Sequence, residues 1–229
     1  DSGQGTERSA SRRRHANLAA SAHPALIPSM ASAFQLTEVR GPELEPWIDV
    51  LGALRIAVFR EFPYLYEGDL KYEREYLRTY LSCPRSLVVF ARDASGRTIG
   101  ATTCMPMADE TEGFRGPFER AGMPTDDVLY LGESIVLPEF RGGGLGVEFF
   151  ARREAHARRL GLTKTAFCAV DRPADHPARP AGHRPLDAFW TRQGYRRRPE
   201  LQAVFPWKEV GEEQESPKTL TFWTKTWTA

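Results

Sequence analysis

Three consecutive glycines stand between a strand-like run and a helix-like run near the middle of this 229-residue chain. The segment consists of Arg141, Gly142, Gly143, Gly144, Leu145 and Gly146. The first turn of a helix carries N–H groups without intrahelical partners and lies at the positive end of the helix dipole, so it attracts anions. Glycine lets a bulky anion approach because no Cβ stands in the way. The residue types therefore predict a phosphate site.

A strand and a helix are expected to position this turn. Residues 129–137 (LYLGESIVL) are rich in β-branched and large apolar side chains, and Pro138 ends the run because it has no N–H for a ladder. From Leu145 to Leu160, apolar residues recur every three or four positions among charged ones, as on one buried helix face.

Three phosphate-binding patterns compete for the glycine turn. A P-loop needs Lys-Ser or Lys-Thr after its glycines, and none follows here. A dinucleotide fingerprint begins at Gly144, but Phe149 occupies its third glycine position. The third pattern, Gln/Arg-x-x-Gly-x-Gly/Ala after a strand that ends in a proline bend, is matched in full by Arg141 to Gly146.

Composition limits the class of protein. The chain is 41% hydrophobic and 27% charged with a formal net charge of +1, which favours one domain with a real core and no general affinity for nucleic acid. No apolar run approaches the roughly 20 residues of a membrane helix. Three cysteines (Cys83, Cys104 and Cys168) lack metal-ligand spacing and indicate reduced core thiols in a cytoplasmic protein.

The order of elements predicts a mixed α/β sheet of about seven strands with flanking helices in a single domain over residues 30–229, after a disordered extension at residues 1–29. The expected strands are 34–39, 86–92, 98–105, 129–137, 163–170, 201–207 and 220–227, and the expected helices are 43–62, 70–81, 145–160 and 185–193, with a short helix near 116–121.

This order, together with the Arg141–Gly146 motif, resembles the GNAT family of N-acetyltransferases over about residues 34–227. The resemblance implies an acyl-CoA acyltransferase fold and acetyl-CoA as co-substrate. It implies that the backbone of Ser134, Ile135 and Val136 pairs with the pantetheine arm. It also implies that Arg141 to Gly146 hold the pyrophosphate.

Acetyl transfer to an amine needs a neutral amine, a donor for the oxyanion and a proton for the leaving thiolate. The tyrosine that often supplies that proton in the family is replaced by Trp190. Glu133 is a candidate base or substrate contact, with a structural pair to an arginine as the alternative, and Tyr130 could donate to the thiolate. Side chains alternate along a strand, so these two point to opposite faces unless a bulge intervenes.

Weaker candidates are Asp171, His176 and His183, whereas Cys168 is not expected to be a nucleophile. A tyrosine-rich segment with acidic residues, 64–80, falls where the family binds its acceptor and would suit a cationic amine, although packing of the two early helices explains it equally well.

The function expected is acetyl transfer to an amine of a small molecule or peptide, with no metal, nucleic acid or membrane partner. A cofactor-binding module without transfer activity, and more weakly a dinucleotide oxidoreductase, stay as alternatives. Trp223 and Trp227 raise the possibility of a homodimer through the last strand.

Overall fold

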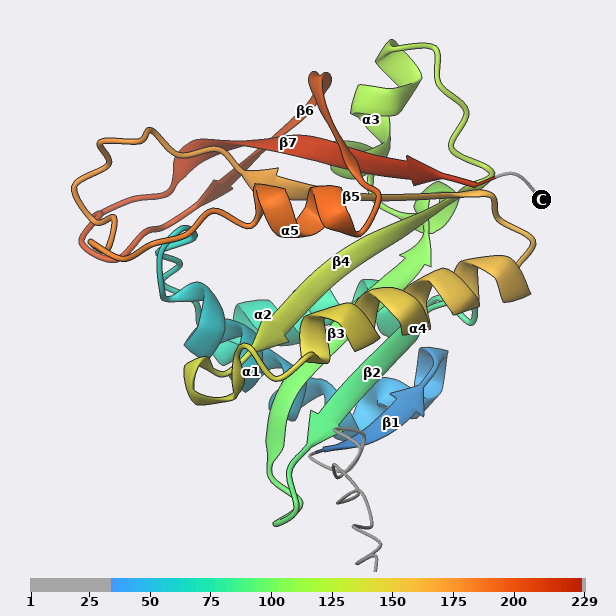
Figure 1. Ribbon diagram of the computed structural model, residues 1–229, viewed down its shortest axis with the longest axis horizontal. Helices are drawn as coiled ribbons and strands as arrows, with labels where there is room; N and C mark the ends of the chain where they lie inside the picture. The colour runs from blue at the N-terminus through green and yellow to red at the C-terminus, as the bar shows by residue number, and fades with distance from the viewer. Residues whose placement is uncertain (1–33, 228–229) are drawn as a thin grey trace, which may run out of the picture. The chain divides into compact units, whose positions relative to one another are not determined.

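The structure is a computed structural model that describes residues 34–227 (Figure 1). The predictions for residues 1–29 lie outside this range. Seven strands form one mixed sheet: β1 (Gln35–Val39), β2 (Leu87–Arg92), β3 (Thr98–Pro106), β4 (Val128–Val136), β5 (Lys164–Val170), β6 (Arg196–Trp207) and β7 (Ser216–Thr226). Their spatial order is β1-β2-β3-β4-β5-β7-β6.

Five α-helices accompany the sheet: α1 (Ile48–Phe59), α2 (Leu70–Leu81), α3 (Glu112–Arg120), α4 (Leu145–Arg159) and α5 (Asp187–Arg192). Short 3₁₀ turns are η2 (Gly41–Trp47), η3 (Met107–Asp109) and η4 (Pro138–Phe140). The predicted element order is confirmed. The predicted helix over 43–62 is instead a 3₁₀ turn followed by α1, and α5 begins after Pro185 rather than with it.

Helices cover both faces of the sheet. In Figure 1, α4 and α5 lie in front of the strands, and α1 and α2 lie behind them. One apolar cluster joins α1 and α2 to β2, β3 and β4, and another joins α4 to the opposite side of the same strands. The central strands are therefore buried on both faces, which explains why β2 is a nearly continuous apolar run and why even Thr102 and Thr103 of β3 are buried.

The only parallel pair among the described strands is β4 with β5, and it is short. Val128, Leu129 and Tyr130 pair with residues 164–166, and beyond Tyr130 the two strands separate. This divergence leaves the second half of β4 without a neighbour on that side. Ser134 is exposed although it lies in a central strand, which agrees with an open gap there.

Candidate active site

The glycine turn forms an open cradle of backbone N–H groups. Gly142 and Gly144 have φ values of +83° and +89°, which side-chain-bearing residues rarely adopt, so the turn depends on glycine at both positions. In the part of the chain that the structure describes, no group accepts a hydrogen bond from the N–H groups of residues 142–146. The glycines are exposed, and α4 begins directly after them. The cradle can therefore accept a phosphate group at the helix N-terminus.

Arg141 does not point freely into solvent. Its Nε donates to the Val136 carbonyl at 3.0 Å, and its Nη1 forms an ion pair with Glu61 at 2.8 Å. This side chain therefore connects the phosphate cradle to the end of β4 and to the segment that follows α1.

The backbone of β4 presents free polar groups to the gap. Alternate residues of an antiparallel strand turn their N–H and C=O to the partner strand. Leu137 N–H donates to Ile99 of β3, so Ile135 faces β3, whereas Ser134 and Val136 turn their backbone groups away from it. The bond from Arg141 to Val136 agrees with that direction.

A β-bulge divides β4. Ser134 pairs with Thr102, but Leu131 pairs with Cys104, so Gly132 and Glu133 together oppose the single residue Thr103. The bulge reverses the alternation beyond it. Tyr130 and Glu133 consequently lie on the same side of the sheet, the side of α1 and α2, which the sequence alone left conditional on such a bulge.

Glu133 lies within a buried ionic network. It is 3% exposed and pairs with Arg55 of α1, which also pairs with Glu73 of α2. The Glu133 carboxylate also accepts from Tyr76 at 3.0 Å and from Thr103. The arginine pair considered from the sequence is therefore present, and both carboxylate oxygens already receive hydrogen bonds.

The charge state of Arg55 follows from this arrangement. Burial alone disfavours a guanidinium, but the neighbouring carboxylates outweigh it and raise the pKa of Arg55 above its ordinary value. The guanidinium also lies over the Tyr76 ring, 4.3 Å from its centroid. Arg55 thus stays charged, and it was missed at the sequence level because an arginine in a helix usually faces water.

Tyr130 lies at the point where β4 and β5 diverge. Its hydroxyl is 3.4 Å from Cys168 Sγ, and the residue is 4% exposed. Burial raises the pKa of Tyr130 well above its ordinary value and raises the pKa of Cys168 to about 12. Both groups are therefore protonated at neutral pH, so Cys168 is no ready nucleophile, as predicted.

A further carboxyl group, Glu110, was missed from the sequence. It follows η3, is 5% exposed, and accepts a hydrogen bond from the Thr111 N–H at 3.0 Å. Burial raises its pKa to about 7. Its position in a stretch of polar residues gave no sign of burial.

The α1–α2 loop is held against the far end of the sheet. Arg172 donates to the carbonyls of Pro63 and Tyr64 at 2.6 and 3.1 Å, and the Trp207 indole donates to Tyr64 at 3.1 Å. A single bridge pairs Tyr66 with Glu209. Two segments therefore form one wall beside the ionic network of Glu133. They are the loop between α1 and α2, and the β6–β7 hairpin.

The remaining candidates have structural contacts. Asp171 accepts from Arg197 and Thr221, each at 2.6 Å. His176 and His183 pack on the Phe62 ring, with centroids 5.6 and 4.7 Å away.

The tryptophans also pack within the protein. Trp190 packs on Phe167 and Trp223, with centroids 5.1 and 5.2 Å away. Trp223 is 5% exposed in the core, so the idea that it lies at an interface was wrong, whereas Trp227 is only partly buried.

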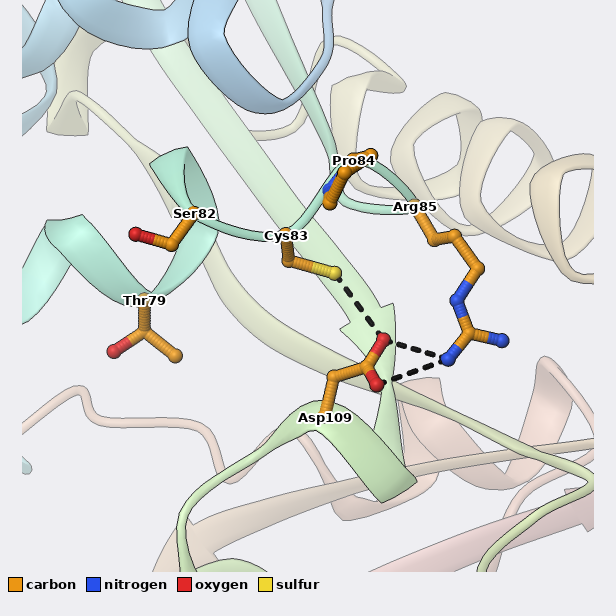
Figure 2. Close-up of a pocket in the computed structure, with 6 residues that line it drawn as sticks. All are labelled: Thr79, Ser82, Cys83, Pro84, Arg85 and Asp109. Carbon is orange, nitrogen blue, oxygen red and sulfur yellow. Dashed lines mark hydrogen bonds and ion pairs between the residues drawn. The ribbon is translucent and has the colours of Figure 1, made fainter.

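A cavity among the described residues lies elsewhere. It has a volume of about 490 Å³ at the C-terminal end of α2, and Figure 2 shows its lining residues, among them Cys83, Arg85 and Asp109. Asp109 accepts from Arg85 at 2.8 and 2.9 Å and from Cys83 at 3.3 Å, so these polar groups already bind one another. Burial raises the pKa of Cys83 to about 11, which leaves its thiol unreactive. We therefore do not place the site in this cavity.

Comparison with known proteins agrees with this geometry. Residues 53–195, more than half of the chain, match the Acetyltransferase (GNAT) family. The mixed α/β sheet with its flanking helices is the fold of GNAT acetyltransferases. The chain belongs to the GNAT acetyltransferase family.

Solved structures share the fold at low identity. A ribosomal-protein-alanine N-acetyltransferase from Brucella melitensis is similar at 18% identity and a TM-score of 0.52, covering 83% of this chain and 99% of its own. A GNAT N-acetyltransferase from Kribbella flavida is similar at 18% identity and a TM-score of 0.51, covering 86% and 99%. An acetyltransferase from Thermus thermophilus is similar at 16% identity and a TM-score of 0.51, covering 85% and 97%.

These identities show the fold alone. No curated protein matches the chain. Between residues 34 and 227, no helix is both long enough and apolar enough to cross a bilayer. The same residues contain no cluster of three or more His, Cys, Asp or Glu side chains suited to a metal ion.

Proposed function

We propose that this protein is an acetyl-CoA-dependent N-acetyltransferase that transfers the acetyl group directly to an amine of a small molecule or peptide. The single observation that carries the proposal is the cradle of N–H groups at residues 142–146, at the end of a strand whose free edge faces a gap. Family membership supports acyl transfer as the reaction class.

The residues present fit coenzyme A. The pyrophosphate would lie on the N–H groups of Gly142 to Gly146, with Arg141 beside it. The amides of the pantetheine arm would bond to the backbone groups of Ser134 and to the Val136 N–H, because the Val136 carbonyl already accepts from Arg141 Nε. Ile135 would contribute through packing rather than hydrogen bonds, because its backbone faces β3.

The thioester carbonyl would lie beside the bulge, where β4 and β5 separate. A backbone N–H beside the bulge would stabilise the oxyanion of the tetrahedral intermediate, but not that of Glu133, which donates to Thr103 Oγ1 at 2.9 Å. Tyr130 and Glu133 line this point from the α1–α2 side. In this proposal Tyr130 protonates the leaving thiolate, and Glu133 fixes Arg55 and Tyr76 around the acceptor.

Isothermal titration calorimetry with acetyl-CoA tests cofactor binding. We expect saturable binding, and no heat at millimolar cofactor would defeat the proposal. Thiol release with a panel of amines then separates an enzyme from a binding module without activity. Binding with no turnover on any amine would favour the module, and failure of NADH to bind would exclude the oxidoreductase alternative.

A further inference from the structure

Glu110 is a buried carboxyl group without a cationic partner. Within residues 34–227 it forms no ion pair, and its sole hydrogen bond comes from the Thr111 N–H, to Oε2. Burying a carboxylate without a counter-charge is costly. A carboxyl group that stays buried in spite of this cost therefore has either a compensating structural role or a chemical role.

The fold places Glu110 on the wall of the candidate active site. Met105 pairs directly with Tyr130 across β3 and β4, and Met107 packs in the same cluster as Tyr130 and Cys168. The Glu110 N–H then donates to Met107 at 3.1 Å, which closes the η3 turn. The turn keeps Glu110 next to Met107, which packs with Tyr130 and Cys168.

Titratable groups on one helix and two strands interact electrostatically with Glu110. They are Tyr76 and Tyr80 on α2, Tyr130 and Glu133 on β4, and Cys168 on β5, all close enough for mutual electrostatic effects.

The charged neighbours from other elements are already paired. Arg115 of α3 pairs with Glu119 at 3.5 Å and donates to the Ala108 carbonyl, and Asp109 is bound by Arg85. No cation on these elements therefore compensates the Glu110 carboxylate.

A second buried polar group, the Tyr80 hydroxyl, lies at the Gly132 bulge. Tyr80 is fully buried, and its hydroxyl has no hydrogen-bond partner among the described residues. It points at the bulge, where a Cβ on Gly132 would lie 2.0 Å from the hydroxyl oxygen. Glycine at position 132 therefore gives the Tyr80 hydroxyl and Thr103 Oγ1 the room that they occupy beside the bulge, since a Cβ would also lie 2.6 Å from Thr103 Oγ1.

The buried charges favour the binding of a cationic group. Among the buried charged residues of α1, α2, η3 with its C-cap and β4, Glu73, Glu110 and Glu133 are carboxylates and Arg55 is the one cation, which is an excess of carboxylates. Glu133 and Glu73 both bind Arg55, although Glu73 Oε1 has no partner among the described residues, so Glu110 is the buried carboxylate of this group that has no cation.

We propose that Glu110 is the general base of the transfer, taking a proton from a cationic acceptor amine beside the Gly132 bulge. This inference rests on the proposed acetyltransferase function. The ammonium group passes one proton to the Glu110 carboxylate. The neutral nitrogen attacks the thioester carbon, the C–N bond forms and the C–S bond breaks. The nitrogen's second proton reaches the thiolate through Tyr130, and Glu110 later releases its proton to water.

The test compares wild type with Glu110→Gln, using Glu112→Gln as the matched control because Glu112 is exposed two residues away. We expect acetyl-CoA to bind all three proteins with the same Kd by calorimetry. We expect kcat on the best amine of the panel to fall by about 10²–10⁴-fold in Glu110→Gln and to stay unchanged in Glu112→Gln. The rise of wild-type kcat with pH near pH 7 should disappear in Glu110→Gln.

The outcomes separate the two proposals. If wild type does not bind acetyl-CoA, the proposed function fails. If wild type transfers acetyl groups and Glu110→Gln keeps its kcat and pH profile, Glu110 is not the base, whereas the function stands. Binding without transfer to any amine overturns the role of Glu110 as well. Glu110→Asp keeps the carboxylate on a shorter arm and should recover part of the lost rate; a rate as low as that of Glu110→Gln would count against the proposal.

Discussion

Tyr130 and Glu133 lie on the same side of the sheet although three positions separate them along β4. Strand residues three apart normally face opposite sides of the sheet. The bulge at Gly132 and Glu133 inserts one extra residue, so the Glu133 side chain faces the same side as that of Tyr130. The same reversal directs Ile135 into the α1–α2 core, while Leu131 packs on the α4 side. One inserted residue therefore gathers the polar groups at the gap.

Gly132→Ala should destabilise the protein. The new Cβ would lie 2.0 Å from the Tyr80 hydroxyl oxygen and 2.6 Å from Thr103 Oγ1, so side chains around the bulge must shift. Overpacking of this kind costs about 1–3 kcal/mol in the free energy of unfolding, measured by urea denaturation. Adding Tyr80→Phe should recover part of the loss, because the nearest clashing atom is removed. Full stability in the single variant would show that the bulge is looser than described.

Tyr80→Phe by itself should be neutral or stabilising. The hydroxyl is buried and unpartnered, so its removal takes away a desolvation cost without breaking a hydrogen bond. The measurement is again the urea midpoint. A loss larger than about 1 kcal/mol would indicate that the hydroxyl has a bonding partner in solution.

Arg55→Met should lower the free energy of unfolding more than any surface substitution does. It leaves Glu73 and Glu133 buried without their counter-charge, which costs about 3–5 kcal/mol of unfolding free energy. The loss should shrink as pH falls, because protonation removes the uncompensated charges. The control is Arg74→Met, which breaks the exposed pair with Asp49 and should change little. Equal effects of the two substitutions would contradict the network.

Gly144→Glu should abolish binding of acetyl-CoA. The substitution introduces a negative charge where phosphate is proposed to lie, and the φ of +89° adds backbone strain. Gly122→Glu is the matched control, because Gly122 also has a positive φ of +67° with open space around it, but it follows α3. Calorimetry should show binding only for the control. Loss of binding in both would point to strain or charge in general rather than to the cradle.

Glu61→Gln should tighten acetyl-CoA binding roughly two- to fivefold, because it removes a repulsive charge and releases Arg141 from its ion pair. The gain should diminish with added salt. Glu139→Gln removes a charge from η4 without touching Arg141, since Glu139 pairs with Arg97. An equal gain in this control would attribute the effect to net charge and not to the freed guanidinium.

Glu110→Gln should stabilise the folded state above neutral pH. The folded-state pKa of Glu110 is raised from 4.5 to about 7, so wild-type stability is full below pH 4.5 and declines as pH rises through this window. Glutamine removes the decline, which amounts to about 3 kcal/mol at most. Urea unfolding at acidic and alkaline pH measures it; parallel pH profiles for wild type and variant would contradict the raised pKa.

The backbone architecture was largely predictable from local patterns. The Arg141–Gly146 motif, Pro138 and the helical spacing of Leu145, Phe149 and Phe150 are local signals, and α4 begins where they indicated. Asp69 also caps α2 through the N–H groups of residues 71 and 72, which explains the accurate helix boundary there.

The polar interior was not predictable in the same way. Arg55, Glu73 and Glu110 occupy a helix or loop pattern that normally faces solvent, and their burial depends on partners more than 15 residues away or on the η3 turn. The bulge likewise depends on how β3 registers against β4, which no local spacing specifies. Contacts between distant segments therefore determine the chemistry, whereas local periodicity determines the scaffold.

The short β4–β5 ladder separates the sheet into two parts that carry different segments of the candidate site. Three residue pairs and the α4 crossover join two antiparallel halves, one bearing the phosphate cradle and the other the hairpin that Arg172 and Trp207 fasten to the α1–α2 loop. In the proposed function, substitutions in that hairpin would reshape the acceptor wall while leaving the glycine turn intact. Acceptor preference would then be free to change during evolution without any change at the proposed coenzyme A site.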